Sequence, residues 1–148
     1  MEKPLTQHIR TDKRPLTLQE YEKVGGYQAV RKVLKEMTPG AVTNLVKEST
    51  LRGRGGAGFG TGMKWSFVPL DAPRPKYLVA NADEMEPGTF KDRILLESTP
   101  HQLIEGMIIA AFAIQADISY IYLRWAYKTA AQAITRAIDE AVQAGYLG

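Results

Sequence analysis

The order of apolar segments in the second half of the chain constrains the fold most strongly. Residues 77–80 and 118–123 form two short apolar runs that are typical of β-strands. Residues 100–116 and 128–144 follow them with the spacing of α-helices. A strand, a helix, a second strand and a second helix predict a parallel strand pair joined by a right-handed crossover. The predicted fold class is therefore α/β, and we expect both strands to be buried.

The helix boundaries in this half carry their own signals. Thr99 and Pro100 fit the N-cap and the first position of the helix over residues 100–116. That helix is apolar on almost every side, so we expect it to be buried on several of them. The helix over residues 128–144 is amphipathic, and Gly145 fits the position just after its end.

The N-terminal third predicts an arm followed by three helices. Residues 1–16 are polar and predict an extended arm, and residues 17–20 (T-L-Q-E) match a capping box that starts a helix near Leu18. Two glycines, Gly25 and Gly26, end this helix. Residues 27–37 predict a second helix, and a third begins at Thr38 and Pro39 and runs to about residue 48. We therefore divide the chain into residues 1–50, an arm with helices, and residues 51–148, an α/β part.

Composition excludes several classes of function. The 148 residues contain no cysteine, which excludes disulfides, thiolate zinc sites, a catalytic thiol and iron–sulfur clusters held by this chain. With only two histidines, a histidine-based zinc site is not expected, and a net charge of +3 gives no argument for nucleic acid. The longest apolar run, residues 107–114, is far shorter than the roughly 20 residues of a membrane span. The polar N-terminus shows no signal peptide, so we expect a cytoplasmic protein.

A glycine-rich loop is the first candidate for a binding site. Six of the ten residues 53–62 are glycine, and residues 53–58 match G-x-G-x-x-G. The dinucleotide fingerprint needs a strand before this motif, and a polar helix end precedes it here. A P-loop is excluded as well, because Met63 and Trp65 flank Lys64 where that motif has Gly and Ser or Thr.

The composition of the loop still favours a nucleotide or a flavin. Glycines expose backbone N–H groups to flat or anionic ligands. Cations and aromatic rings lie within or beside the run: Arg52, Arg54, Lys64, Phe59, Trp65 and Phe67. The alternative interpretation is a flexible surface loop.

An acidic segment, residues 81–88 (N-A-D-E-M-E-P-G), is the second candidate. It directly follows the first predicted strand, and ligands of open α/β folds bind at the carboxyl ends of strands. Asn81 offers donors and acceptors that suit the edge of a ring. The carboxylates of Asp83, Glu84 and Glu86 could bind ribose hydroxyls, a metal ion, or Arg and Lys partners. The alternative is a solvated acidic turn.

The remaining polar residues predict structural contacts. We expect His8 to be solvated and His101 to make a contact in the first turn of its helix. Residues 91–93 (K-D-R) predict a charge cluster at a helix start. Arg124 and Tyr127 follow the second strand, where they either face the site or pack.

Two long motifs resemble one protein family. Residues 51–67 (L-R-G-R-G-G-A-G-F-G-T-G-M-K-W-S-F) and residues 77–93 (Y-L-V-A-N-A-D-E-M-E-P-G-T-F-K-D-R) resemble the NADH-oxidising flavoprotein subunit of bacterial respiratory complex I. The related NAD-reducing hydrogenases and formate dehydrogenases share these motifs. The resemblance extends from about residue 17 to the end of the chain.

The resemblance implies an incomplete Rossmann-like FMN-binding domain preceded by an N-terminal helical segment. It implies that FMN is bound noncovalently by Gly53, Gly55, Lys64, Asn81, Asp83 and Glu84. Gly56 would lie near NADH, Phe59 and Phe67 would stack on the adenine of NADH, and Glu86 would meet its nicotinamide-side ribose or amide. The implied reaction is hydride transfer from NADH to FMN, with electrons passing to iron–sulfur clusters and quinone. No residue of this chain is expected to act as an acid or base, or to bind a metal.

The resemblance also sets expectations about partners and length. Family members are much longer, with a C-G-E-E segment, a ubiquitin-like domain and a domain that holds a 4Fe-4S cluster. We therefore expect residues 51–148 to be the N-terminal part of an FMN- and NADH-binding domain, impaired on its own unless a second chain completes it. The expected partners are peripheral-arm subunits of complex I, above all the 2Fe-2S thioredoxin-like subunit, at the cytoplasmic side of the inner membrane. The alternative is a cofactor-free assembly fragment that docks on a partner chain through its basic arm.

Two positions depart from the family pattern. Gly60 stands where the family usually has proline, which predicts a looser loop and weaker nucleotide binding. The residues Arg124-Trp125-Ala126-Tyr127 stand where the family commonly has R-G-E-Y, so the glutamate of that motif is missing.

Overall fold

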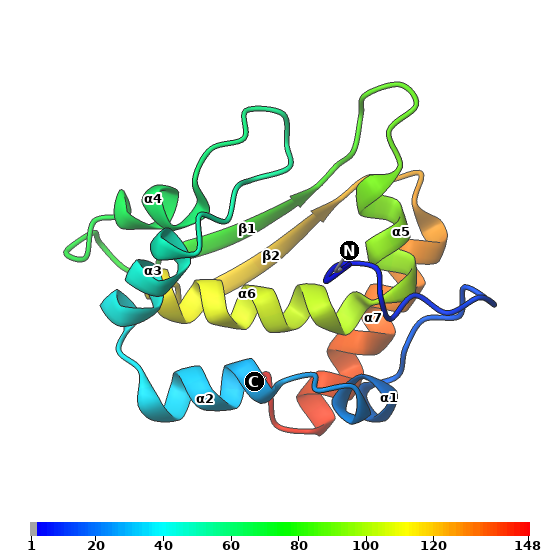
Figure 1. Cartoon of the computed structure of the whole chain (residues 1–148), viewed down its shortest axis with the longest axis horizontal. Helices are drawn as coiled ribbons and strands as arrows, with labels where there is room; N and C mark the ends of the chain where they lie inside the picture. The colour runs from blue at the N-terminus through cyan, green and yellow to red at the C-terminus, as the bar shows by residue number, and fades with distance from the viewer. Residues whose placement is uncertain (1–2) are drawn as a thin grey trace. The chain divides into compact units, whose positions relative to one another are not determined.

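The computed structural model describes residues 3–148 as two compact units. One contains the described part of Met1–Gln28 with Ala80–Gly106 and Ile121–Gly148, and the other contains Ala29–Val79 and Met107–Tyr120. The elements in chain order are α1 (Leu18–Lys23), α2 (Gln28–Glu36), α3 (Pro39–Glu48), α4 (Thr61–Ser66), β1 (Tyr77–Ala82), α5 (Lys91–Ser98), α6 (Pro100–Ile114), β2 (Ile118–Leu123) and α7 (Lys128–Gln143) (Figure 1). The order confirms an α/β fold.

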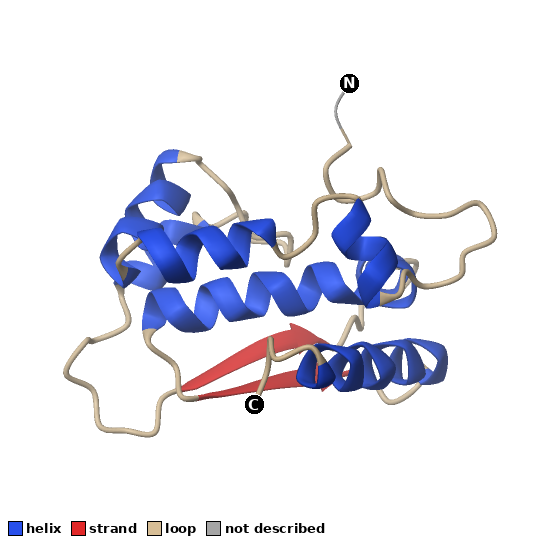
Figure 2. Cartoon of the chain, turned by 90° about the horizontal axis from the view of Figure 1, so that it is seen from below, coloured by secondary structure: helices blue, strands red, loops and turns tan. Residues whose placement is uncertain are grey.

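The two strands form a parallel pair. The N–H of Ile118 donates to Lys76 O at 3.2 Å, and six residues further along both strands the N–H of Arg124 donates to Ala82 O at 3.2 Å. Figure 2 shows both strands running in the same direction. The crossover between them contains α5 and α6. The helix start predicted at residues 91–93 is the start of α5.

The prediction that both strands are buried is wrong. Alternate side chains of β1 and β2 remain more than half exposed: Tyr77 53 %, Val79 57 %, Tyr120 54 % and Tyr122 63 %. Side chains of a strand point alternately to opposite faces. In these two strands only one face packs on a core, and the apolar runs did not distinguish one buried face from two.

Each unit has its own apolar core. In the first, Ala82 and Leu96 pack with Ala130 and Ile134 of α7, and Ile121 and Leu123 of β2 join them. In the second, Val33, Val42 and Ala113 pack with Trp65 and Phe112. Nearly every residue of α6 is buried or half-buried, as its apolar composition predicted. None of the helices within residues 3–148 has the length and hydropathy of a membrane span.

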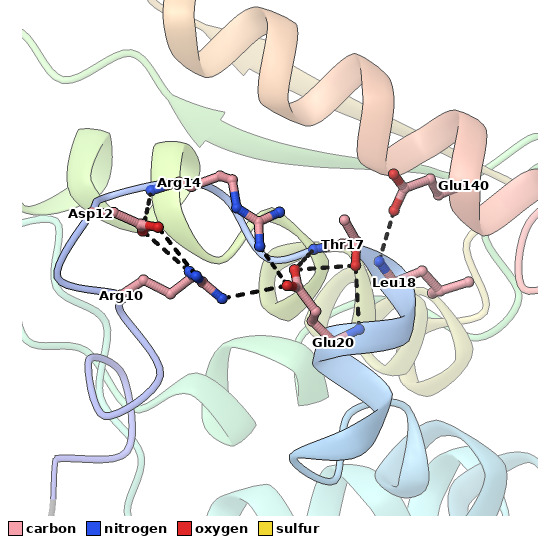
Figure 3. Close-up of polar contacts among 7 residues, drawn as sticks. All are labelled: Arg10, Asp12, Arg14, Thr17, Leu18, Glu20 and Glu140. Atoms are coloured by element: carbon pink, nitrogen blue, oxygen red, sulfur yellow. Dashed lines mark hydrogen bonds and ion pairs between the residues drawn. The ribbon is translucent and has the colours of Figure 1, made fainter.

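The local helix signals are largely confirmed. The capping box of α1 is complete, because the N–H of Glu20 donates to Thr17 Oγ1 and the N–H of Thr17 donates to the Glu20 carboxylate (Figure 3). Thr38 caps α3 with Pro39 at its first position. Gly145 ends α7 at φ +76°, and the N–H of Tyr146 donates to Ala141 O in a Schellman motif. Thr99 differs from its prediction, since its hydroxyl donates to Leu95 O.

The N-terminal arm is tied to its own unit by charges. Arg10 and Arg14 both pair with the Glu20 carboxylate, and Arg10 also pairs with Asp12 (Figure 3). The backbone N–H of Thr17 and the Arg14 guanidinium lower the pKa of Glu20 to about 2. Leu16 is buried and its N–H donates to Ser98 O at 3.0 Å. Much of the positive charge of the arm is therefore already paired within the chain.

His101 of α6 contacts α7 and the turn before α2 inside the first unit. It is fully buried, with Nδ1 2.9 Å from the Tyr27 hydroxyl and Nε2 3.1 Å from Glu140 Oε2. The same carboxylate oxygen accepts the N–H of Leu18 at 2.7 Å (Figure 3). Burial lowers the pKa of His101 below its ordinary value, although the Glu140 carboxylate opposes this. The first-turn contact predicted for His101 is confirmed.

We expect the free energy of unfolding to fall as the pH drops below the ordinary pKa of histidine, about 6.5. In that range the unfolded chain binds a proton that folded His101 does not, so stability rises with pH up to this value and then levels off. Denaturant unfolding at a series of pH values measures the slope. The variant His8→Gln should keep the slope and His101→Gln should flatten it. A wild-type stability that is constant across this range would contradict the prediction.

Candidate functional site

The glycine-rich loop is closed by a short antiparallel bridge. The N–H of Gly53 donates to Phe59 O at 2.9 Å and the N–H of Thr61 donates to Leu51 O at 2.8 Å, on either side of the pair Arg52 and Gly60. Inside this closure Gly56 has φ +110° and Gly58 has φ +62°, where L side chains are strained. The sequence needs glycine at both positions for the loop to turn back on itself.

The closed loop leaves its backbone donors free. Within residues 3–148, none of the N–H groups of residues 54–58 donates a hydrogen bond to the chain, and no ion pair involves Arg54 or Lys64. A cavity of about 580 Å³ adjoins the loop, within the usual range for small-molecule sites. Its lining comes from the loop, α4, β1 and the end of α6: Gly53, Gly55, Ala57, Gly58, Phe59, Thr61, Lys64, Trp65, Val68, Leu78, Val79 and Ile114.

The helix α4 was not predicted, and it carries Lys64 to this cavity. It has six residues (T-G-M-K-W-S), and the glycine among them makes its sequence resemble the loop before it. Tertiary contact makes it a helix: α4 packs on α3, with Gly62 buried directly against the backbone of Lys47. Only a residue without a side chain allows this approach.

Two exposed aromatic rings flank α4. Phe59 lies just before it and Phe67 just after it, and their ring centroids are 6.1 Å apart with an interplanar angle of 51°. Their exposed fractions are 49 % and 65 %. The sequence-based expectation that both stack on one adenine requires adjacent rings, which the structure provides. A base between them would require the two rings to separate.

Gly60 uses a backbone conformation that proline also adopts. Its φ is −64°, its N–H donates no backbone hydrogen bond among residues 3–148, and a Cβ there would lie 3.7 Å from Met63 Cβ. Glycine at this position therefore gives the unfolded chain extra conformational entropy, which is lost on folding, although the fold does not need the freedom of glycine there.

We expect Gly60→Pro to raise the free energy of unfolding by about 0.4–1 kcal/mol, because proline restricts the unfolded chain. The same restriction holds the loop ready for a ligand, so the variant should bind FMN and NADH more tightly. Denaturant unfolding and titration calorimetry measure the two effects. Gly60→Ala serves as the control for the added Cβ, and equal nucleotide affinity in Gly60→Pro and the wild type would refute the expected loosening.

The acidic segment lies in the other unit and is organised around Glu84. Glu84 is 4 % exposed, and its carboxylate accepts the N–H groups of Asp92 and Arg93 at 3.1 and 3.3 Å. It also accepts the Tyr127 hydroxyl at 3.0 Å. Burial opposes ionisation of Glu84, but these hydrogen bonds and the nearby Lys91 outweigh it and lower its pKa. The carboxylate thus caps the N-terminus of α5 as an anion.

The other predicted residues of this segment are more open. The side chain of Asn81 accepts the N–H of Asp83 at 3.0 Å in a tight local turn. Asn81 and Glu86 are exposed, Asp83 is half-exposed, and Gly88 turns the chain at φ +80°. Three carboxylates close in sequence therefore have separate surroundings, and only Glu84 is fully engaged.

Arg124 and Tyr127, left open by the sequence, both contact the acidic segment. Arg124 Nη1 donates to Glu84 O and lies 3.3 Å from Met85 Sδ, while Tyr127 reaches the Glu84 carboxylate. Their signal in the sequence was their place after the second strand, at the same sheet edge as residues 81–86. They hold the acidic segment in place.

The structure groups the predicted site residues into two sets. Gly53, Gly55, Phe59 and Lys64 line the cavity in one unit, where Gly56 and Phe67 also lie. The other unit contains Asn81, Asp83, Glu84 and Glu86. Among the described residues, no group of carboxylates and histidines has the arrangement of a metal site.

Comparison with known proteins assigns the family. The sequence profile of the Nuo51 FMN-binding domain matches residues 46–147. This chain belongs to the Nuo51 FMN-binding domain family. The glycine loop, α4 and the acidic segment all lie within the matched residues, and the resemblance drawn from the two sequence motifs is confirmed.

Relatives of this Nuo51-type chain carry consistent descriptions. It is 61 % identical over 131 residues to the second F-type subunit of NADH-quinone oxidoreductase in Rhizobium meliloti (strain 1021), a match that covers 88 % of the chain and 31 % of the relative. It is 53 % identical over 146 residues to the F-type subunit of NADH-quinone oxidoreductase in Escherichia coli (strain K12), covering 98 % and 33 %. The chain thus spans about a third of the length of these relatives.

A solved structure shares the fold of the chain. The crystal structure of the NAD+-reducing [NiFe]-hydrogenase in the air-oxidized state matches with a TM-score of 0.70 and 38 % sequence identity. The match covers 90 % of this chain and 24 % of the hydrogenase chain. This similarity agrees with the predicted incomplete Rossmann-like fold.

Proposed function

We propose that this chain binds FMN and serves as part of an NADH-oxidising subunit of the complex I type. The observation that carries the proposal is the closed glycine loop beside a cavity of about 580 Å³. Within residues 3–148, the backbone N–H groups of residues 54–58 donate no hydrogen bond and Lys64 forms no ion pair. The relatives are described as F-type subunits of NADH-quinone oxidoreductase, which supports the substrate and the reaction.

The residues present fit a flavin nucleotide. Backbone N–H groups of residues 54–58 and the Lys64 ammonium suit a phosphate and an anionic ring edge. Added side chains at Gly55 and Gly56 would project into open space, so a ligand can approach the backbone there. Asn81 and Asp83 would contact polar atoms of the flavin ring or the ribitol chain. Glu84 would contact FMN as well, while its carboxylate accepts the N–H groups at the N-terminus of α5.

We propose that the side chains and backbone of this chain bind FMN and NADH and orient them relative to each other. Bound FMN supplies the hydride-accepting chemistry, which requires stacking and alignment more than a protein acid or base. Phe59 and Phe67 would hold the adenine of NADH, Gly56 would let NADH approach the loop, and Glu86 would meet the nicotinamide-side ribose or amide. No catalytic side chain of this chain is required.

The assembly is proposed on the same basis. The relatives are named as subunits, which supports partner subunits for this chain. We propose peripheral-arm partners, including the 2Fe-2S subunit, a place at the cytoplasmic side of the membrane, and electron transfer through iron–sulfur clusters of other segments to quinone. We further propose that residues 1–50 form a separate helical segment and residues 51–148 belong to the FMN- and NADH-binding domain.

A cofactor-free docking fragment is the second candidate. The exposed side of the strands supports it, because Tyr77 and Tyr120 stack at 6.1 Å between centroids and remain more than half exposed. Large exposed apolar surfaces mark interaction sites in soluble proteins. This candidate differs from the first in one observable property, the retention of flavin.

Flavin absorbance of the purified chain, measured after adding FMN and then NADH, tests the proposal. Retained flavin that bleaches with NADH supports the oxidoreductase, and retained flavin that does not bleach reduces the proposal to FMN binding. Failure to retain flavin favours the docking fragment. Lys64→Gln should weaken FMN binding, whereas Lys35→Gln, an exposed lysine of α2, should leave it unchanged.

A further inference from the structure

We propose that Trp125 is a stacking platform for a ring of the bound nicotinamide dinucleotide, held in position by Lys128. This inference rests on the proposed function and adds a contact that the family motifs do not include, since the family commonly has glycine at this position. It comes from the exposure of one large ring at the carboxyl end of β2.

Trp125 is an exposed ring on a fixed base. Its side chain is 87 % exposed, although it lies two residues beyond the end of β2. The residues on both sides are anchored: Arg124 Nη1 donates to Glu84 O, and the Tyr127 hydroxyl donates to the Glu84 carboxylate. Arg124 also contacts Met85, the neighbour of Glu86. The backbone of Trp125 is thereby fixed to the acidic segment proposed to bind nucleotide.

Lys128 orients the ring. Its ammonium lies over the indole face at 3.0 Å from the ring centroid, within the range of a cation–π contact. One face of the indole is covered by this contact, which leaves the opposite face for a ligand. A ring held in advance loses less conformational freedom when a ligand stacks on it. The ammonium also places a positive charge where a nucleotide phosphate would be favoured.

The open position suits the ligand that exchanges during turnover. A resident flavin is enclosed by its site, whereas the dinucleotide enters and leaves with every reaction. Ligands of open α/β folds bind outside the carboxyl ends of the strands, where Trp125 lies. Glu86, proposed to meet the nicotinamide-side ribose, belongs to the segment that Arg124 and Tyr127 hold. These points favour a dinucleotide ring over the flavin ring as the partner of Trp125.

Titration calorimetry of the FMN-loaded chain with NAD+ tests the proposal. Stacking of a base on an aromatic side chain predicts that Trp125→Gly weakens NAD+ binding about tenfold. Trp125→Phe should recover most of the affinity, and Lys128→Gln should lose about twofold to threefold, since the ring becomes mobile. Tyr120→Ser removes an exposed aromatic side chain of β2, the strand that precedes Trp125, and should have no effect. Titrations with AMP and with nicotinamide mononucleotide then identify which ring stacks.

The outcomes separate this inference from the function on which it rests. If Trp125→Gly binds NAD+ as the wild type does, or if it loses FMN and keeps NAD+, Trp125 is no platform for the dinucleotide. A loss that Trp125→Phe does not recover would assign Trp125 a structural role and also overturn the proposal. If the wild-type chain binds neither FMN nor NAD+, the proposed function itself fails, which the first titration shows before any variant is compared.

Discussion

Gly62→Ala is expected to lower the free energy of unfolding by about 3 kcal/mol, at the upper end of what overpacking costs. A Cβ at this position would lie 2.4 Å from Lys47 N and 2.6 Å from Lys47 Cα. Both are backbone atoms of α3, so no side-chain rotation relieves the collision. The better helix propensity of alanine, worth about 1 kcal/mol, is too small to compensate. The two helices must separate, which moves Lys64 away from the cavity and should abolish FMN retention.

Denaturant unfolding of Gly62→Ala beside Gly106→Ala provides the matched comparison. Gly106 also lies inside a helix, α6, but no atom lies within 4 Å of a Cβ built there. Gly106→Ala should therefore raise the free energy of unfolding by about 0.5–1 kcal/mol through helix propensity alone. If the two variants change stability in the same direction, the close contact between α3 and α4 does not have the importance assigned to it.

The predictions that succeeded depend on local physics. The capping box of Thr17 and Glu20, the start of α3 at Pro39 and the Schellman motif at Gly145 each involve residues within one or two helical turns. Hydrogen-bonding needs at a helix end are the same in any fold, so these residues identify the ends without knowledge of tertiary structure. The α/β order and the position of the acidic segment at the carboxyl end of β1 followed from the same local patterns.

The predictions that failed depend on contacts between distant segments. Helix α4 forms because Gly62 packs on Lys47, and nothing within residues 61–66 indicates that partner. Whether one or both faces of β1 and β2 are buried depends on which other segments pack against them, and the two apolar runs do not contain that information. The sequence indicated the sign and the density of charge at residues 83–86, but it did not show that Glu84 alone is buried. That distinction is set by the N-terminus of α5 and by Tyr127, 43 residues further along the chain.

The sequence indicated the segments of the candidate site but not the cavity beside the glycine loop. Glycines and a lysine near residue 60 indicated an anion-binding loop, because free N–H groups and a cation have that chemistry in any fold. The cavity beside the loop limits the size of a ligand. Part of its lining consists of Leu78, Val79 and Ile114, which have no distinguishing feature in the sequence. The sequence did not indicate that the Trp125 ring is exposed, because the exposure of a side chain depends on the tertiary structure.

Glu84→Ala is the second change for which we expect a large effect, a loss of about 3 kcal/mol in the free energy of unfolding. The variant removes the acceptor for two backbone N–H groups of α5 and for the Tyr127 hydroxyl. Hydrogen bonds to charged groups contribute a net stabilisation of about 1.5–3 kcal/mol each, and the cost of burying the Glu84 carboxylate offsets part of their sum. Glu86→Ala is the matched control, because Glu86 is exposed in the same segment and should change stability by less than about 0.5 kcal/mol.

The pH dependence and the conservative variant separate the charge of Glu84 from its shape. Its pKa is lowered in the folded state, so its stabilising effect is present above the ordinary glutamate value and is lost as the pH falls through the lowered one. Glu84→Gln should lose about half of the stabilisation at neutral pH, since the amide accepts fewer of the three donors, and should lack this acid-dependent loss. Equal stability of Glu84→Gln and the wild type across the pH range would show that α5 does not need the charge. A normal fold of Glu84→Gln with weakened FMN binding would instead place the carboxylate in direct contact with the flavin, because the capping role alone acts only through the position of residues 83–86.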